Sequence, residues 1–171
     1  GIIKGAFLVR MVKKDVEKYI RENPDYIPAQ NMFLEYAPVV AFNYSGIQKM
    51  LNKPLISVDI NHCYFRTAYL LGYITEKTYL KGMPYKKAMN ASIGSLNKYI
   101  YKEEYCAGEK IREFCNEDEY LMFKPIYHKI LERVSDCMHE CFYELGDDIV
   151  MWLTDCAFIN EDALPKLHDI F

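Results

Sequence analysis

The longest regular pattern of apolar and polar positions lies between residues 118 and 145. Apolar side chains recur there every three or four residues, which places them on one face of a helix: Phe123, Ile126, Tyr127, Ile130, Leu131, Val134, Cys137, Met138, Cys141, Phe142 and Leu145. A continuous stripe of this kind is typical of a helix that packs against a core, and not of a cofactor site. We therefore predict a helix over 118–145 that ends at Gly146.

Shorter apolar runs predict strands. Residues 55–60 have the pattern of a buried strand into which one carboxylate, Asp59, is inserted. Residues 148–153 and 156–159 are predicted to pair as a hairpin whose turn contains Asp155. Together with the long helix, these strands predict an α+β fold with a small antiparallel sheet covered by helices.

The remaining segments give weaker patterns. Four shorter helices are predicted, and the cues for their ends are Asn-Pro, Gly and Thr residues: 13–22, 62–71, 76–80 and 85–97. Other expectations are a half-exposed strand over 98–106, a terminal helix over 161–171 and irregular structure with one strand over 25–46. Residues 1–12 give an ambiguous pattern, for which a strand is one interpretation.

A chain of 171 residues is long enough for one domain with a real core. We expect residues 1–54 to be an N-terminal extension, with a short helix and an irregular segment, and residues 55–171 to be the main domain. The first twelve residues are neither a signal peptide nor a membrane span. The missing initiator Met suggests a trimmed tag or an excised fragment, and we expect a cytoplasmic protein without a membrane partner.

Charge and cysteine content narrow the classes of function. The net charge of −3 argues against nucleic-acid binding by bulk electrostatics. However, six lysines and no acid lie between Lys77 and Lys102, so these lysines either form a basic face or simply solvate helices. The six cysteines include no CxxC pair and are expected to be reduced thiols. A structural zinc site with Cys137, Cys141 and a distant pair is the alternative.

Two acids carry the candidate chemistry. A buried carboxylate needs a cation or a metal ion, so Asp59 either binds a metal or is an N-cap or salt-bridge residue. Asp155 is either a metal ligand or an ordinary turn residue. The helix over 85–97 places Lys86 and Asn90 on one face. Two carboxylates and a lysine are what a two-metal phosphoryl-transfer site requires, with Mg²⁺ or Mn²⁺ as the ion.

Three motifs resemble the palm of family B DNA polymerases. The first family motif, Asp-x-x-Ser-Leu-Tyr-Pro-Ser, corresponds here to Asp59-Ile60-Asn61-His62-Cys63-Tyr64-Phe65-Arg66. The second, Lys-x-x-x-Asn-Ser-x-Tyr-Gly, corresponds to Lys86-Lys87-Ala88-Met89-Asn90-Ala91-Ser92-Ile93-Gly94. The third, Tyr-x-Asp-Thr-Asp-Ser, corresponds to Met151-Trp152-Leu153-Thr154-Asp155-Cys156. The resemblance spans about residues 55 to 160, in the family's order.

The resemblance implies a role for each matching residue. Asp59 and Asp155 would be the catalytic metal ligands, with help from the carbonyl of Ile60. Tyr64 would lie under the deoxyribose, although a core position is the alternative. Lys86 would contact the incoming triphosphate, and Asn90 would line the same helix face or lie on the surface. The implied partners are DNA and a deoxynucleotide, in a minimal or degenerate polymerase of the phage or mobile-element kind.

The chain also departs from the family pattern. Leu153 occupies the position of a family acid, and Phe65 and Arg66 replace Pro-Ser. The segment 62–97 leaves only stub fingers, and few residues remain for an exonuclease or a thumb. The chain would therefore need parent-chain domains or a protein partner. The alternatives are a non-catalytic palm-like protein that binds nucleic acid or a replication partner, and an unrelated α+β domain.

Overall fold

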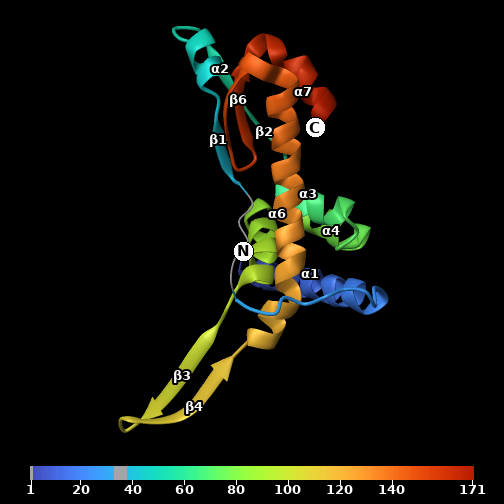
Figure 1. Ribbon diagram of the computed structural model, residues 1–171. Coiled ribbons are helices and arrows are strands. Elements are labelled where there is room, and N and C mark those ends of the chain that lie inside the picture. Colours follow the sequence, from blue (N-terminus) through green and yellow to red (C-terminus); the bar gives the residue numbers. More distant parts are fainter. Residues whose placement is uncertain (1, 33–37) are drawn as a thin grey trace. The chain divides into compact units, whose positions relative to one another are not determined.

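The computed structural model describes residues 2–32 and 38–171, with side chains from Lys4 onward, and consists of helices and two antiparallel sheets (Figure 1). The helices are α1 (Ile2–Glu22), α2 (Tyr44–Lys49), α3 (Cys63–Leu70), α4 (Glu76–Gly82), α5 (Lys86–Gly94), α6 (Glu117–Leu145) and α7 (Leu164–Ile170). The strands are β1 (Val40–Phe42), β2 (Leu55–Asp59), β3 (Tyr101–Cys106), β4 (Glu109–Cys115), β5 (Ile149–Leu153) and β6 (Cys156–Asn160). The predicted α+β class is confirmed.

The chain divides into two compact units, each built from two segments. The helical unit comprises Gly1–Glu35 and Ala68–Lys129, and the sheet unit comprises Tyr36–Thr67 and Ile130–Phe171. The boundary expected after residue 54 is not a boundary between these units. The assignment of residues 55–171 to a palm-like domain remains a prediction.

The sheet unit is built on four antiparallel strands in the order β1-β5-β6-β2. The second half of α6 and the terminal helix α7 pack on one face of this sheet (Figure 1). Their common core contains buried side chains from both helices, from the turn before α7 and from two strands: Cys141, Leu145, Ile149, Ala157, Ile159, Ala163 and Leu167. The α6 stripe is therefore buried or half-buried along its length, as predicted, and strands 55–59 and 149–153 belong to one sheet.

β2 corrects one sequence prediction. The apolar run of residues 55–60 predicted a buried strand, but β2 is the edge strand of the sheet and alternates exposed with half-buried positions. Ile56 and Val58 pack against the core, whereas Asp59 at the end of the strand is exposed. An edge strand with one covered face needs only alternate apolar side chains, so the carboxylate does not have to be buried.

The helical unit begins with the largest error of the sequence prediction. Residues 1–12 gave an ambiguous pattern with a strand as one alternative, and only 13–22 predicted a helix, but one helix runs over Ile2–Glu22. Leu8, Val12 and Val16 are buried at four-residue spacing along α1, which packs against α5. The short helices α4 and α5 lie where they were predicted, and Thr75 caps α4 by accepting a hydrogen bond from the Thr78 N–H group.

β3 and β4 form a separate two-stranded hairpin whose residues are all exposed. The turn residues Ala107 and Gly108 have φ values of 50° and 82°, as a type I′ turn requires. The sequence predicted only the first strand, and it predicted half-exposure.

The irregular structure predicted over 25–46 overlaps the start of α2. Residues 33–37 of that predicted stretch lie outside the described residues. Within the described ranges, no helix has the length and apolar character needed to cross a membrane.

Candidate active site

Asp59 and Asp155 lie at the same end of the four-stranded sheet. Asp59 is the last residue of β2 and pairs with Cys156, the first residue of β6. Asp155 immediately precedes Cys156, in the turn that joins β5 to β6. The N–H group of Ile60 donates a hydrogen bond to the carbonyl oxygen of Asp155, over 2.9 Å. The strand pairing therefore brings together two acids that are almost a hundred positions apart in the sequence.

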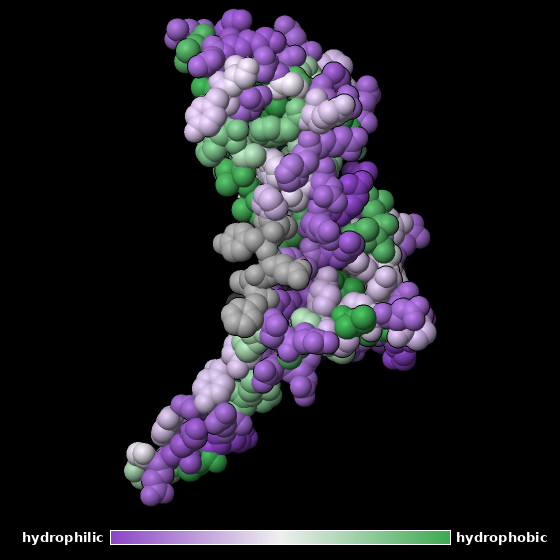
Figure 2. All heavy atoms as spheres, viewed as in Figure 1, coloured by the Kyte–Doolittle hydropathy of each residue, from purple (hydrophilic) through white to green (hydrophobic). Residues whose placement is uncertain are grey.

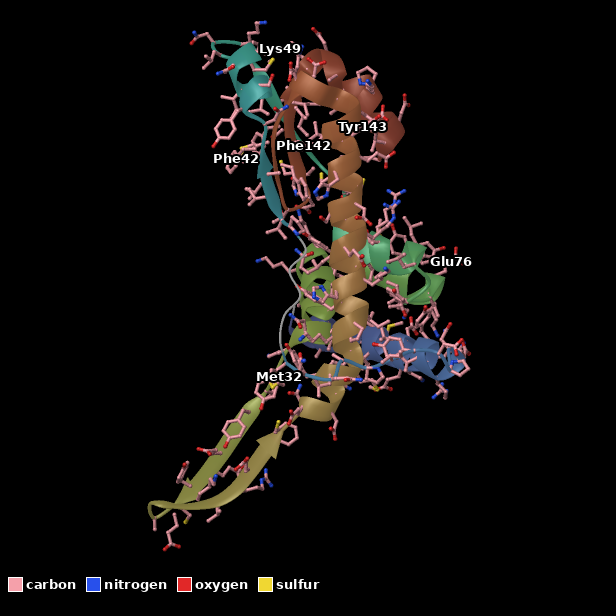
Figure 3. All side chains as sticks on the ribbon, viewed as in Figure 1. Met32, Phe42, Lys49, Glu76, Phe142 and Tyr143 are labelled. Carbon is pink, nitrogen blue, oxygen red and sulfur yellow. The ribbon has the colours of Figure 1, made fainter. Side chains whose placement is uncertain are left out.

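The register shows which sheet face carries Asp59. Leu153, Cys156 and Asp59 lie directly opposite one another on β5, β6 and β2. Directly opposed residues of antiparallel strands point to the same face, so Asp59 lies on the face away from the core. On the core face, the Phe142 ring of α6 meets Trp152 with ring centroids 6.0 Å apart, whereas Phe42 of β1 projects away from α6 (Figure 3).

The outer face of the sheet carries exposed apolar side chains beside the acids. Phe42 is 58% exposed, and Val40, Leu55 and Leu153 are also exposed. Figure 2 shows apolar side chains gathered over the strands of this sheet. The acids therefore lie at the rim of an open, largely apolar surface.

The turn that carries Asp155 is tightly constrained. Thr154 has a φ of 54°, which is uncommon for a β-branched residue. Its N–H group donates to the carbonyl oxygen of Val39 over 2.6 Å, and its hydroxyl group donates to the Asp155 carboxylate over 2.9 Å. These bonds hold the turn against β1 and orient the carboxylate. The sequence identified Thr154 as a turn residue and as the threonine of the third motif, but not its bonds to Val39 and Asp155.

Among the residues that the structure describes, neither acid forms an ion pair with a basic side chain. In the described part of the chain, the ion pairs involve other carboxylates, so a salt-bridge role for Asp59 is not supported. A pair of neighbouring carboxylates without a cation creates a negative local potential, which attracts a divalent cation.

The charges of Asp59 and Asp155 both affect the pKa values of two cysteine thiols, those of Cys63 and Cys156. Burial raises the pKa of the Cys63 thiol to about 12, and the charges of Asp155 and Asp59 act in the same direction. Burial also raises the pKa of Cys156 to about 11, together with the hydrogen bond between its thiol and Asp59 and the charges of both acids. Both thiols therefore stay protonated at neutral pH in the metal-free chain. Strand register brings Cys156 opposite Asp59, whereas Cys63 lies four positions after Asp59 at the start of α3.

The oxygen donors fit Mg²⁺ or Mn²⁺ bound jointly with a phosphate. Among the residues that the structure describes, no group of three or more His, Cys, Asp or Glu side chains is arranged to hold a metal ion. Mg²⁺ commonly takes one or two carboxylates and completes its shell with water and substrate phosphates. The same finding leaves Cys137 and Cys141 without further zinc ligands from the described side chains, so the zinc alternative is not supported.

The loop between β2 and α3 contains a buried polar atom that lacks a partner. His62 has a φ of 53°, and its Nδ1 atom is buried without a hydrogen-bond partner among the described residues. Buried polar atoms are almost always satisfied, so a water molecule or a ligand at this loop would remove an energetic cost. This orphaned atom lies three positions after Asp59 and is consistent with a binding role for the loop.

The other predicted site residues lie on α3 and α5. Tyr64 is half-buried in the first turn of α3, in the sheet unit with the two acids. Lys86 and Asn90 are exposed on one face of α5, and a Cβ atom on Gly94 of the same face would meet no other atom within 4 Å. The structure therefore shows an exposed face on α5 that carries these residues. Because α5 belongs to the helical unit, its approach to the acids remains a prediction.

Comparison of the chain with protein-family models, with curated proteins and with solved structures found no match. The functional argument therefore depends on the residues and their geometry. The described geometry contributes three observations: the paired acids, the absence of a described cationic side chain paired with them, and the orphaned atom in the loop after β2.

Proposed function

We propose that this chain is the palm-like part of a DNA polymerase of the family B type, in minimal form or as part of a larger assembly. The observation that carries the proposal is the pairing of β2 with β6, which sets Asp59 beside the turn that holds Asp155. A metal-dependent polymerase needs two carboxylates at neighbouring strand ends, open to substrate on one side and supported by packed helices on the other.

In the proposed reaction, Asp59 and Asp155 hold the divalent ion, and Tyr64 supports the sugar of the incoming deoxynucleotide. A bound divalent ion would supply charge stabilisation for the attacking and leaving oxygen atoms. The 3′-hydroxyl oxygen of a primer forms a bond to the α-phosphorus, its proton passes to water, and the bond to the β-phosphate breaks to release pyrophosphate. Lys86 would neutralise charge on the triphosphate, and Asn90 would line the same helix face.

Leu153 limits the proposed site. It replaces the further acid of the family motif and lies in the same cross-strand row as Asp59. An aliphatic side chain cannot coordinate a cation, so the site has only two acidic ligands. We therefore propose weak metal binding that a nucleotide strengthens by adding its phosphate oxygens.

The proposed partners are DNA, a deoxynucleotide and either parent-chain domains or a protein that completes the grip on the primer. Precise positioning of the reacting groups can lower a barrier by about 7–11 kcal/mol. Most of that contribution requires fingers and thumb that hold the nucleotide and the primer. The stub fingers, residues 62–97, supply little of it. We also propose a cytoplasmic location, which fits six free cysteines.

A non-catalytic palm-like protein is the second candidate. The exposed apolar residues of the outer sheet face favour it, because such surfaces often bind partners. The two candidates differ in one respect: only the polymerase needs the carboxylates of Asp59 and Asp155. Partner binding to the apolar face would survive their conversion to amides.

A primer-extension assay with Mn²⁺ at low salt tests the proposed activity. We expect slow addition of single nucleotides by the whole chain, without processive synthesis, because little holds the primer. Asp155→Asn should abolish the addition, and Asp147→Asn, which alters an exposed acid at the opposite end of β5, should preserve it. Extension that is equal in both variants would show that these carboxylates do not catalyse the reaction. No extension even with added partner domains would favour the non-catalytic candidate.

A further inference from the structure

A second candidate site lies in the helical unit, in a cavity of about 420 Å³ between α1 and α4. Four basic side chains line it: Arg10 and Lys14 from α1, and Lys77 and Lys81 from α4. None of the six ion pairs found among the described residues includes any of these four. A cavity with this charge balance repels cations and attracts anions.

Helical spacing explains how the basic side chains gather. Phe7, Arg10 and Lys14 are three and four positions apart, so they share one face of α1. Lys77 and Lys81 are four positions apart and share one face of α4. Sequence reasoning noted the lysines between residues 77 and 102. Of their partners on α1, Lys14 lies in the predicted helix 13–22, whereas Arg10 lies in the half of α1 that was not predicted.

The one carboxylate in the cavity has a structural role. Asp15 accepts hydrogen bonds from the Thr75 N–H group, the Thr75 hydroxyl group and the Thr78 hydroxyl group, over 2.8, 2.9 and 2.6 Å. These bonds fix the start of α4 against α1 and keep the basic residues of both helices around one space. One carboxylate offsets only one of the four positive charges.

The cavity also has an aromatic wall. Phe7 is 51% exposed, and the Nζ atom of Lys81 lies 5.7 Å from the centre of its ring. An exposed aromatic ring among cations is the combination that binds a nucleotide, because the base stacks on the ring while lysine and arginine bind the phosphate. We propose that this cavity binds a nucleotide, either free or as one unit of a single nucleic-acid strand.

This inference is independent of the proposed polymerase activity. Every residue that lines the cavity belongs to the helical unit, whereas Asp59 and Asp155 belong to the sheet unit. Binding to the cavity needs no divalent ion, since its own cations meet the phosphate. An experiment with EDTA therefore measures the cavity without a contribution from metal-dependent binding at the acids.

Fluorescence polarisation of the whole chain with EDTA at low salt tests the proposal, with a labelled thymidine oligonucleotide and a fluorescent adenosine triphosphate as probes. Arg10→Gln/Lys14→Gln and Lys77→Gln/Lys81→Gln should each raise the dissociation constant about tenfold or more, because each pair removes two phosphate contacts. The control Lys18→Gln/Lys102→Gln removes two exposed charges of the same unit outside the cavity and should change it less than about twofold.

Further results would identify the ligand more closely or overturn the proposal. If the chain binds only the oligonucleotide, the ligand of the cavity is a single nucleic-acid strand. If it binds only the triphosphate, the ligand is a free nucleotide. Phe7→Leu should weaken either probe about fivefold or more, since base stacking on an aromatic ring is lost, but should not weaken competition by inorganic tripolyphosphate. Equal weakening by the cavity and control pairs, or no binding of either probe, would overturn the proposal.

Discussion

Gly46 lies where α2 passes closest to β5. A Cβ atom at this position would lie 2.3 Å from the carbonyl oxygen of Ile149 and 3.1 Å from that of Asp147. Backbone atoms cannot move aside as a flexible side chain can. We therefore expect Gly46→Ala to lower the free energy of unfolding of the sheet unit by about 1–3 kcal/mol. Urea unfolding followed by the fluorescence of Trp152, the single tryptophan, measures the change.

Gly94 is the matched control, since a Cβ atom there meets nothing within 4 Å. It ends α5 with helical backbone angles, so Gly94→Ala should leave stability unchanged or raise it by up to about 1 kcal/mol. Circular dichroism of both variants in urea provides the comparison. Equal stability of the two variants would contradict the close approach of α2 and β5.

Asp59 and Asp155 show how far single residues could be predicted. The strand before Asp59 and the turn around Asp155 were both predicted correctly, because each has a local pattern of apolar and turn residues. The exposure of Asp59 was not predicted, because an edge strand and a central strand can carry similar apolar runs. The contribution of Cys156 depends on cross-strand register, which local sequence does not encode.

Met138 tests the packing of α6 on the sheet. It is fully buried in the second half of the helix, and its predicted stripe position is confirmed. Met138→Ala should lower the free energy of unfolding by about 2–5 kcal/mol, because it removes buried surface and leaves a cavity. Tyr143 lies on the same helix and is 86% exposed (Figure 3), so Tyr143→Ala should change stability by less than about 0.5 kcal/mol. If urea unfolding shows similar losses of stability for Met138→Ala and Tyr143→Ala, the described orientation of α6 is contradicted.

The β3–β4 hairpin should respond to acid. Hydrogen bonds from Tyr101, Tyr105 and Lys110 lower the pKa of Glu103 from 4.5 to about 2. A lowered folded-state pKa adds stability that is present above pH 4.5 and is lost as the pH falls toward 2. The nuclear magnetic resonance signals of the tyrosine rings, followed from about pH 6 to about pH 2, should show the hairpin losing its order as the pH falls below about 4.5.

Glu103→Gln removes the titrating group and is the control for the acid response. In this variant the tyrosine signals should change little between about pH 4.5 and 2. A wild-type hairpin whose signals remain constant over the same range would show that these hydrogen bonds do not order it. The effect should be confined to the hairpin, because its side chains are exposed and contribute no buried core.

The elements whose buried faces have the most regular apolar period were predicted best. The α6 stripe and the β5–β6 hairpin each bury a regular face, so their periodicity is visible in the sequence. β4 was missed because both of its faces are exposed, which leaves no apolar alternation to detect. The first half of α1 was misread because its β-branched residues and Gly5 favour other structures locally, whereas packing on α5 favours the helix.

The chain as a whole consists of two units, and the proposed chemistry is divided between them. The sheet unit holds Asp59, Asp155 and Tyr64, and the helical unit holds Lys86, Asn90 and the basic cavity. From motif order the sequence predicted that Asp59 and Asp155 act together, and the structure places both acids in the sheet unit, while their role as metal ligands stays a prediction. The sequence also showed the lysines between residues 77 and 102, but not the cavity, which requires two helices that are distant in the sequence to pack together.

Binding of Mn²⁺, followed by the loss of the free-ion signal in electron paramagnetic resonance, tests the central claim most directly. We expect wild-type chain to bind Mn²⁺ with a dissociation constant on the order of 10⁻⁴–10⁻³ M, because only two carboxylates contribute, and added deoxynucleotide to strengthen the binding. Asp59→Asn and Asp155→Asn should each weaken it about tenfold or more, and the control Asp147→Asn should not. Equal Mn²⁺ binding by the wild type and all three variants would contradict a metal site formed by Asp59 and Asp155.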